Sequence, residues 1–207
     1  MARLRLSTTF IVLLTIAACS NPASDAPKAV TGEAGSASSA PAASEKHSIT
    51  AENSKIEWVG SKVTGSHNGS FKKFSGAIDY AGQPEKSRVN ITIDTSSIEA
   101  DDPKLTAHLK TADFFDVAKF PQATFQSTEI KPGGEKGATH TVTGNLQLHG
   151  VTKAITFPAT INVTPGVITV QSNFAINRKD FGINYAGAAD NLIRDEVVLK
   201  FDVRATK

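Results

Sequence analysis

The sequence predicts an all-β protein, an antiparallel β-barrel of about eight strands with one short helical segment. Apolar and polar residues alternate with period two over most of the chain beyond residue 47, which is typical of strands with one buried and one solvated face. Only one stretch of this region has a helical pattern, so helical crossovers are excluded and the strands must be antiparallel. Closing the sheet into a barrel would bury the apolar faces of that many long strands. A sandwich of two sheets would bury the same faces.

Residues 1–18 are typical of a signal peptide for secretion. Arg3 and Arg5 precede an apolar run that is shorter than the roughly 20 residues of a membrane-spanning helix. The run ends in Ile-Ala-Ala-Cys, which resembles a bacterial lipoprotein box, and Cys19 is the only cysteine. We therefore expect lipidation of Cys19, the alternative being a simple signal with an incidental cysteine. Because Ser20 follows, the expected location is the outer membrane of the cell envelope, with the domain facing the periplasm.

Residues 19–46 are predicted to be a disordered tether that begins at the lipidated cysteine. This stretch consists mostly of Ala, Ser, Pro and Gly, and such a composition cannot bury enough apolar surface to offset the entropy of ordering. A flexible chain of about 27 residues spans on the order of 30 Å. The folded domain is therefore expected to stand away from the membrane.

Residues 47–207 are predicted to form one domain with a large core. Loss of the two signal arginines changes the 22 basic residues to 20, against 20 acidic residues, so the net charge is about zero. Since the domain is neutral and has no basic run, nucleic acid is not an expected partner.

The predicted strands and turns follow one another along this domain. The clearest alternation covers residues 89–94, 142–148, 155–163, 168–176 and 197–203. Turn signals rich in Gly and Pro separate the strands, at residues 65–69, 82–84, 132–134, 150 and 165–166.

The single helical pattern lies in residues 101–125. Asp102 suits the N-cap, where its side chain accepts an N–H, and Pro103 suits the first helical position. Leu105 and Leu109 share a helix face, and the proline after Phe120 forces an extended conformation in which a strand restarts. We expect this segment to be a lid that closes or enters the barrel.

An ordered set of motifs then identifies a resemblance. The motifs are SKIEWV from Ser54, GSFKKFSG from Gly69, VNITID from Val89, HLKTADFFD from His108, VTGNL from Val142, LHGVTK from Leu148 and INRKDFG from Ile176. In this order they resemble the YceI-like family of bacterial periplasmic lipid-binding proteins. The resemblance implies an extended lipocalin-like barrel whose tunnel holds a polyisoprenoid or another long amphiphilic chain. Asn145 and the Thr106-Ala107 pair depart from the family pattern.

The resemblance also suggests which residues line the tunnel, because alternation alone does not distinguish a cavity from a filled core. The predicted lining residues are Phe71, Phe74, Ile78, Leu105, Leu109, Phe114, Phe115, Phe125, Leu146, Leu148, Phe157, Ile161, Phe174 and Ile176. The predicted contacts to a ligand head group are His108, Arg178 and Asp180. The alternatives are structural: His108 paired with a carbonyl or Asp113, and Arg178 paired with Asp180.

Catalysis is not expected. The five histidines show no metal-ligand spacing, and no Gly-x-Ser-x-Gly motif occurs. Asp113 and Asp116 could pair as two carboxylates near the helix end, but caps and solvated charges explain them as well. No catalytic residue, metal or cofactor is therefore predicted, apart from a bound polyisoprenoid or quinone-type lipid.

The leading hypothesis is binding, storage or transport of a long apolar lipid across the periplasm. The expected partners are the lipid and the membrane, with an envelope protein or a second copy of the chain as further possibilities. The first alternative is a packed barrel that serves as a structural or interaction module of the envelope. The second is an enzyme that acts on a lipid.

Overall fold

The computed structural model describes residues 21–36, 41–189 and 191–207. The predicted signal peptide, residues 1–18, and the predicted lipidation site, Cys19, lie outside these residues. No helix of the described part is long and apolar enough to cross a membrane.

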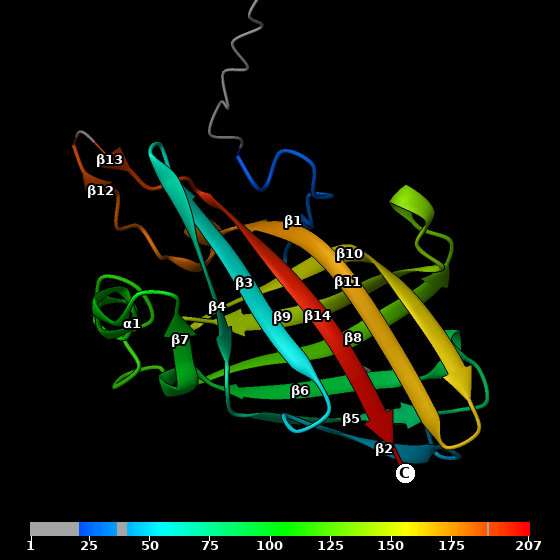
Figure 1. The fold of residues 1–207 in the computed structure, drawn as a ribbon. Coiled ribbons are helices and arrows are strands. Elements are labelled where there is room, and N and C mark those ends of the chain that lie inside the picture. Colours follow the sequence, from blue (N-terminus) through cyan, green and yellow to red (C-terminus); the bar gives the residue numbers. More distant parts are fainter. Residues whose placement is uncertain (1–20, 37–40, 190) are drawn as a thin grey trace, which may run out of the picture.

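Eight antiparallel strands form a closed barrel (Figure 1). In their order around the barrel they are β2 (Glu45–Thr50), β5 (Phe74–Tyr80), β6 (Arg88–Asp94), β8 (Gln122–Pro132), β9 (His140–Leu148), β10 (Val151–Thr164), β11 (Val167–Asn177) and β14 (Glu196–Thr206). The alternating residues place one face of each strand in a shared core, as the burial patterns show. The predicted all-β barrel with one short α-helix is confirmed.

Three further strands extend one side of the barrel beyond β14. They are β3 (Lys55–Lys62), β4 (Gly65–Phe71) and β7 (Ile98–Ala100), and they pair in the order β14, β3, β4, β7. The prediction of a turn over residues 65–69 is wrong, because these residues form most of β4. Two glycines in that stretch suggest a turn, but Gly69 is required for close packing against β3, as described below.

The α-helix α1 (Pro103–Leu109) begins as predicted. The Asp102 side chain accepts a hydrogen bond from the N–H of Leu105 at 2.8 Å. The strand β8 begins at Gln122, directly after Phe120 and Pro121. Four 3-10 helices occupy other connections: η1 (Pro84–Lys86), η2 (Thr95–Ser97), η3 (Glu135–Gly137) and η4 (Arg178–Phe181).

The prediction of a disordered tether over residues 19–46 is wrong for residues 21–36, here called the N-terminal segment. Ala23 and Ala26 are buried against Ala175 and Val198 of the barrel wall. Strand β1 (Val30–Gly32) pairs with the first half of β10. Composition suggested disorder because small side chains bury little area, but small side chains also allow the backbone to lie directly on a sheet.

The N-terminal segment fills a gap in the barrel wall. Strands β10 and β11 pair only over 160–164 and 167–171, and nearer the other end they diverge. In that gap β1 pairs with residues 154–156, while the N–H of Ala175 donates to the carbonyl of Pro27 at 2.8 Å. The segment therefore satisfies backbone groups that two separated strands leave unpaired.

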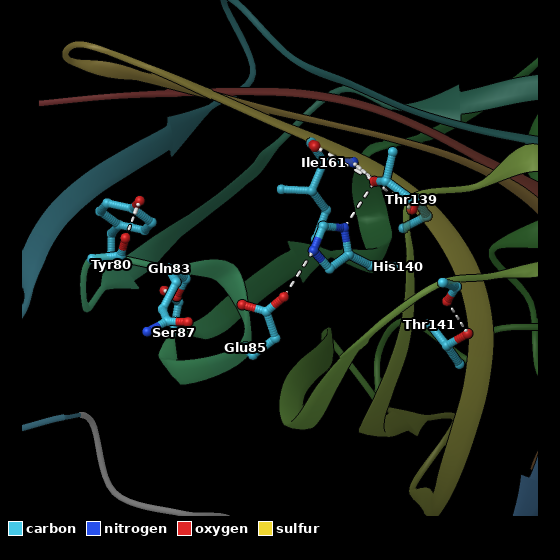
Figure 2. A network of polar contacts seen from close by, with 11 residues as sticks. Tyr80, Gln83, Glu85, Ser87, Thr139, His140, Thr141 and Ile161 are labelled. Atoms are coloured by element: carbon cyan, nitrogen blue, oxygen red, sulfur yellow. Dashed lines mark hydrogen bonds and ion pairs between the residues drawn. The ribbon is translucent and has the colours of Figure 1, made fainter.

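A polar network fastens the end of the barrel that lies away from α1 (Figure 2). His140, at the start of β9, contacts Glu85 of η1 at 3.4 Å and Thr139 at 2.8 Å. The Thr139 hydroxyl accepts the N–H of Ile161 in β10 at 2.9 Å. These contacts join the connection between β5 and β6, the connection between β8 and β9, and strand β10 at this end.

Candidate functional site

The barrel encloses an apolar cavity of about 430 Å³. Its wall is built from the inward faces of the strands together with α1 and the segment after η4. Nearly all lining side chains are aliphatic or aromatic, for example Ile91, Val142 and Leu199. Such a cavity suits a ligand with an extended apolar surface, because few polar groups are present to hold water.

Twelve of the fourteen residues predicted to line the tunnel do line this cavity. They are Phe71, Ile78, Leu105, Leu109, Phe114, Phe115, Phe125, Leu146, Leu148, Phe157, Ile161 and Ile176. The structure therefore brings these side chains together around one space. Ligand contact at each of them stays a prediction.

Phe74 and Phe174 do not line the cavity. Phe174 has the same orientation along β11 as Ile176, but its ring stacks on Phe157 at 4.2 Å and lies 5.7 Å from the ring of Phe201. These two rings cover Phe174, which is fully buried. Phe74 is buried in the core at the start of β5. Both residues belong to the buried core but not to the lining of the cavity.

The cavity opens beside α1, and its partly exposed lining residues there are here called the mouth. They are His67 of β4, His108 of α1, Tyr185 of the segment after η4 and Asn191 of β13 (Asn191–Leu192). β13 pairs with β12 (Gly187–Ala188) in a small hairpin above this opening. Polar side chains are thus placed at one end of an apolar space.

His108 has the structural partner that the alternative predicted, while its contact with a ligand head group stays a prediction. Its Nε2 contacts the Asp113 carboxylate at 2.7 Å, so the imidazole has a structural partner. Its ring also lies 5.0 Å from the rings of Phe114 and Tyr185 and lines the cavity. Asp113 therefore orients the imidazole of His108 at the mouth. Because Asp113 faces His108, it does not pair with Asp116 as two carboxylates.

A second histidine and aspartate pair lies at the mouth. The Nδ1 atom of His67 contacts the Asp101 carboxylate at 2.8 Å, and the N–H of Asn68 donates to the same group. Burial raises the pKa of Asp101, but these hydrogen bonds outweigh it, and the net pKa is lower than the ordinary value. The sequence does not reveal this pair, since it depends on the pairing of β4 with β7.

Arg178 is a structural anchor that also reaches the cavity. Its guanidinium donates to the carbonyl groups of Ile183, Ile193 and Arg194, at 2.7 to 3.4 Å. Burial lowers the pKa of Arg178, and the nearby Asp195, at 3.5 Å, acts in the opposite direction. Arg178 thus holds the segment that carries the mouth.

The predicted pairing of Arg178 with Asp180 is wrong. The strand ends at Asn177, and η4 follows, so the alternation that placed both side chains on one face no longer applies. Asp180 does not line the cavity.

Trp58 and Tyr185 line the cavity and were missed by sequence reasoning. Trp58 stands in a predicted strand motif, and its alternation with Ile56 already indicated an inward face. Tyr185 lies in an irregular segment, for which periodicity gives no signal. Within the described residues, no group of three or more His, Cys, Asp or Glu side chains could hold a metal ion.

A model of the YceI-like domain matches residues 47–205. A UPF0312 protein of Pseudomonas putida strain W619 is 35% identical over 166 residues, which cover 76% of this chain and 85% of the relative. A UPF0312 protein of Enterobacter sp. strain 638 is 46% identical over 92 residues, which cover 44% and 46% of the two chains.

Three solved structures share the fold. BcnA of Burkholderia cenocepacia superposes with a TM-score of 0.68 at 28% identity and covers 76% of this chain and 99% of its own. A polyisoprenoid binding domain from Saccharophagus degradans gives 0.63 at 20% identity, with coverage of 79% and 99%. The Campylobacter jejuni YCEI protein gives 0.59 at 27% identity, with coverage of 67% and 84%. Because the family model spans the whole barrel from β2 to β14, the chain belongs to the YceI-like family.

Proposed function

We propose that the protein binds one long apolar lipid chain, a polyisoprenoid or isoprenoid quinone, inside the barrel. The observation that carries this proposal is the apolar cavity of about 430 Å³, whose lining is mostly aliphatic and aromatic. The polyisoprenoid binding domain from Saccharophagus degradans, which shares the fold, supports the same ligand class.

The energetics favour a chain-shaped ligand. Each CH₂ group moved from water into an apolar cavity contributes about 0.8 kcal/mol, so a chain that fills the barrel binds tightly with few polar contacts. At the mouth, His67 and His108 each present an imidazole held by a carboxylate. Either imidazole can hydrogen-bond a hydroxyl or quinone oxygen of the head group.

Storage or transport in the bacterial envelope extends this proposal. An apolar chain is insoluble in the periplasm, and a closed barrel shields it from water during transfer. The predicted signal at residues 1–18 and lipidation at Cys19 would place the domain beside a membrane. Binding is favoured over catalysis, because the described polar groups at the mouth contain no nucleophile with an adjacent base.

Solvent extraction of the purified protein tests the ligand class. The extract is examined by mass spectrometry, and one apolar chain per protein is the expected result. A protein that repeatedly yields no lipid, although it is purified from its own host without detergent, would favour the packed structural module instead.

A further inference from the structure

Three exposed apolar side chains border the mouth of the cavity and are here called the apolar rim. They are Val63 with 56% of its surface exposed, Leu192 with 49% and Tyr185 with 36%. Only two other large apolar side chains of the described residues are as exposed, Val30 and Val163. Three of the five most exposed large apolar side chains of the described residues therefore lie beside the mouth. Figure 1 shows the turn between β3 and β4 and the hairpin of β12 and β13, which carry Val63 and Leu192, next to each other at one end of the barrel.

The apolar rim is continuous with the cavity. The N–H of Val63 donates to the carbonyl of Leu192 at 3.2 Å, which holds the turn between β3 and β4 against β13. The ring of Tyr185 lies 5.0 Å from that of His108, and both residues line the cavity. A chain that leaves the cavity by the mouth therefore passes these side chains first.

The chain enters the described structure at the same end. Asn21 contacts the hydroxyl of Ser61 at 3.5 Å and the carboxylate of Glu196 at 3.4 Å. Ser61 lines the cavity and lies two residues before Val63. Two Cα steps, each of about 3.8 Å, separate Asn21 from Cys19. An acyl group on Cys19 would therefore attach the barrel to a membrane within a short distance of the apolar rim.

We propose that the apolar rim inserts shallowly into a lipid bilayer, so that the bound chain exchanges directly between bilayer and cavity. This inference rests on the proposed function and adds the surface through which the ligand passes. Valine and leucine favour the acyl region, while tyrosine favours the boundary where its hydroxyl stays hydrated. The position of Asn21 favours a membrane over a second copy of the chain or another protein.

Site-specific labelling tests which end of the barrel touches the bilayer. In residues 19–207 with Cys19→Ser, a single cysteine at Leu192→Cys carries a nitrobenzoxadiazole label. The matched control is Val163→Cys, which is 40% exposed in the β10–β11 hairpin at the opposite end. Vesicles contain phosphatidylethanolamine, phosphatidylglycerol and a spin-labelled lipid that quenches the fluorophore. Both proteins lack residues 1–18, the expected signal peptide, because its apolar run would otherwise insert into the bilayer and hold position 192 there.

We expect strong quenching of the label at position 192 and little quenching at position 163. Equal quenching at both positions, or quenching at neither, would overturn the inference. A rise in the fluorescence of the label at position 192 that occurs without vesicles and only at high protein concentration would also overturn it, because burial of the label between two protein molecules would identify a second copy of the chain as the occupant.

Ligand exchange gives an independent readout. Vesicles loaded with ubiquinone deliver it to the protein, and quenching of Trp58, the only tryptophan, reports its arrival in the cavity. Val63→Glu with Leu192→Glu should slow delivery at least about tenfold, whereas Val163→Glu should not. If both variants take up ubiquinone as fast as the parent, the inference fails while the proposed function stands. If the parent takes up none and yields no lipid on extraction, the proposed function fails.

Discussion

Gly69 shows how closely the wall beside the cavity is packed. A Cβ atom at this position would lie 1.9 Å from the carbonyl oxygen of Glu99 and 2.5 Å from the ring of Trp58. Gly69→Ala should therefore push β7 away from β4 and lower the free energy of unfolding by about 3 kcal/mol. Urea unfolding measures this loss.

Gly65 is the matched control on the same strand. A Cβ atom there meets nothing within 4 Å, so Gly65→Ala should change the unfolding free energy by less than about 0.5 kcal/mol. Equal effects of the two substitutions would show that the contact with Trp58 and Glu99 is not what requires glycine.

Arg178 is expected to hold the mouth segment in place. Arg178→Met leaves three buried carbonyl groups without their donor, which should cost about 3 kcal/mol of stability. Hydrogen exchange should also become faster at the N–H of Ile193, which bonds Ala186 within the same segment. Asp180→Asn, in the same 3-10 turn, should leave both readouts unchanged, and a similar effect of the two variants would contradict the anchoring role.

The pair of His67 and Asp101 predicts a pH dependence. The pKa of Asp101 is lowered in the folded protein from an ordinary value of 3.8. Its stabilising contribution is therefore complete above that value and is lost as the pH falls through the folded pKa. Because Asp101 is partly exposed, the contribution is small.

Urea unfolding of the parent and Asp101→Asn checks this sign. The parent should be more stable at pH 7, and the difference should shrink as the pH falls below 3.8. A difference that grows as the pH falls would mean that the carboxylate destabilises the fold.

At the scale of elements, the N-terminal segment is predicted to close the gap between β10 and β11. Ala23→Asp places a charge where a buried methyl group packs against the wall, so the segment should detach. The amide of Ala175, which donates to Pro27, should then exchange with solvent at least about tenfold faster. The control Ser24→Asp changes an exposed neighbour. Unchanged exchange at Ala175 in Ala23→Asp would show that the segment is not needed for closure.

The elements also show what the sequence could and could not reveal. The cap of α1 was predictable because Asp102 and the N–H of Leu105 are close in sequence. The ordered N-terminal segment was not predictable, because it contacts the barrel through backbone groups and alanines. These contacts stabilise the segment only because β10 and β11, far away in the sequence, leave backbone groups unpaired. The pairing of His67 with Asp101 likewise depends on strand register, which alternation alone does not fix.

At the scale of the whole molecule, alternation predicted which side chains face the interior. The long strands and the family resemblance predicted the closed barrel, and the resemblance predicted the cavity that twelve of these side chains line. Alternation could not show that Phe174 stands behind Phe157, because both rings face inward and only their packing order separates them. It also could not distinguish an open interior from a filled one. Only the positions of the side chains in the folded barrel show that the interior is open, and the proposed function depends on this open interior.

Narrowing the cavity should therefore remove ligand binding without loss of the fold. Val170 and Leu199 line the cavity from the adjacent strands β11 and β14. Replacing both with Phe reduces the space for a chain. The matched control places Phe at Gln171 and Lys200, which are exposed neighbours on the same strands. Circular dichroism verifies that each variant remains a β-protein.

Native mass spectrometry of the intact protein is the most direct test of the central claim. The account predicts that the parent and the Gln171 and Lys200 control carry one added mass, that of a single long-chain lipid. The variant with Phe at positions 170 and 199 should lose most of this mass. A parent protein with no added mass, even after incubation with ubiquinone-loaded vesicles, would contradict the account.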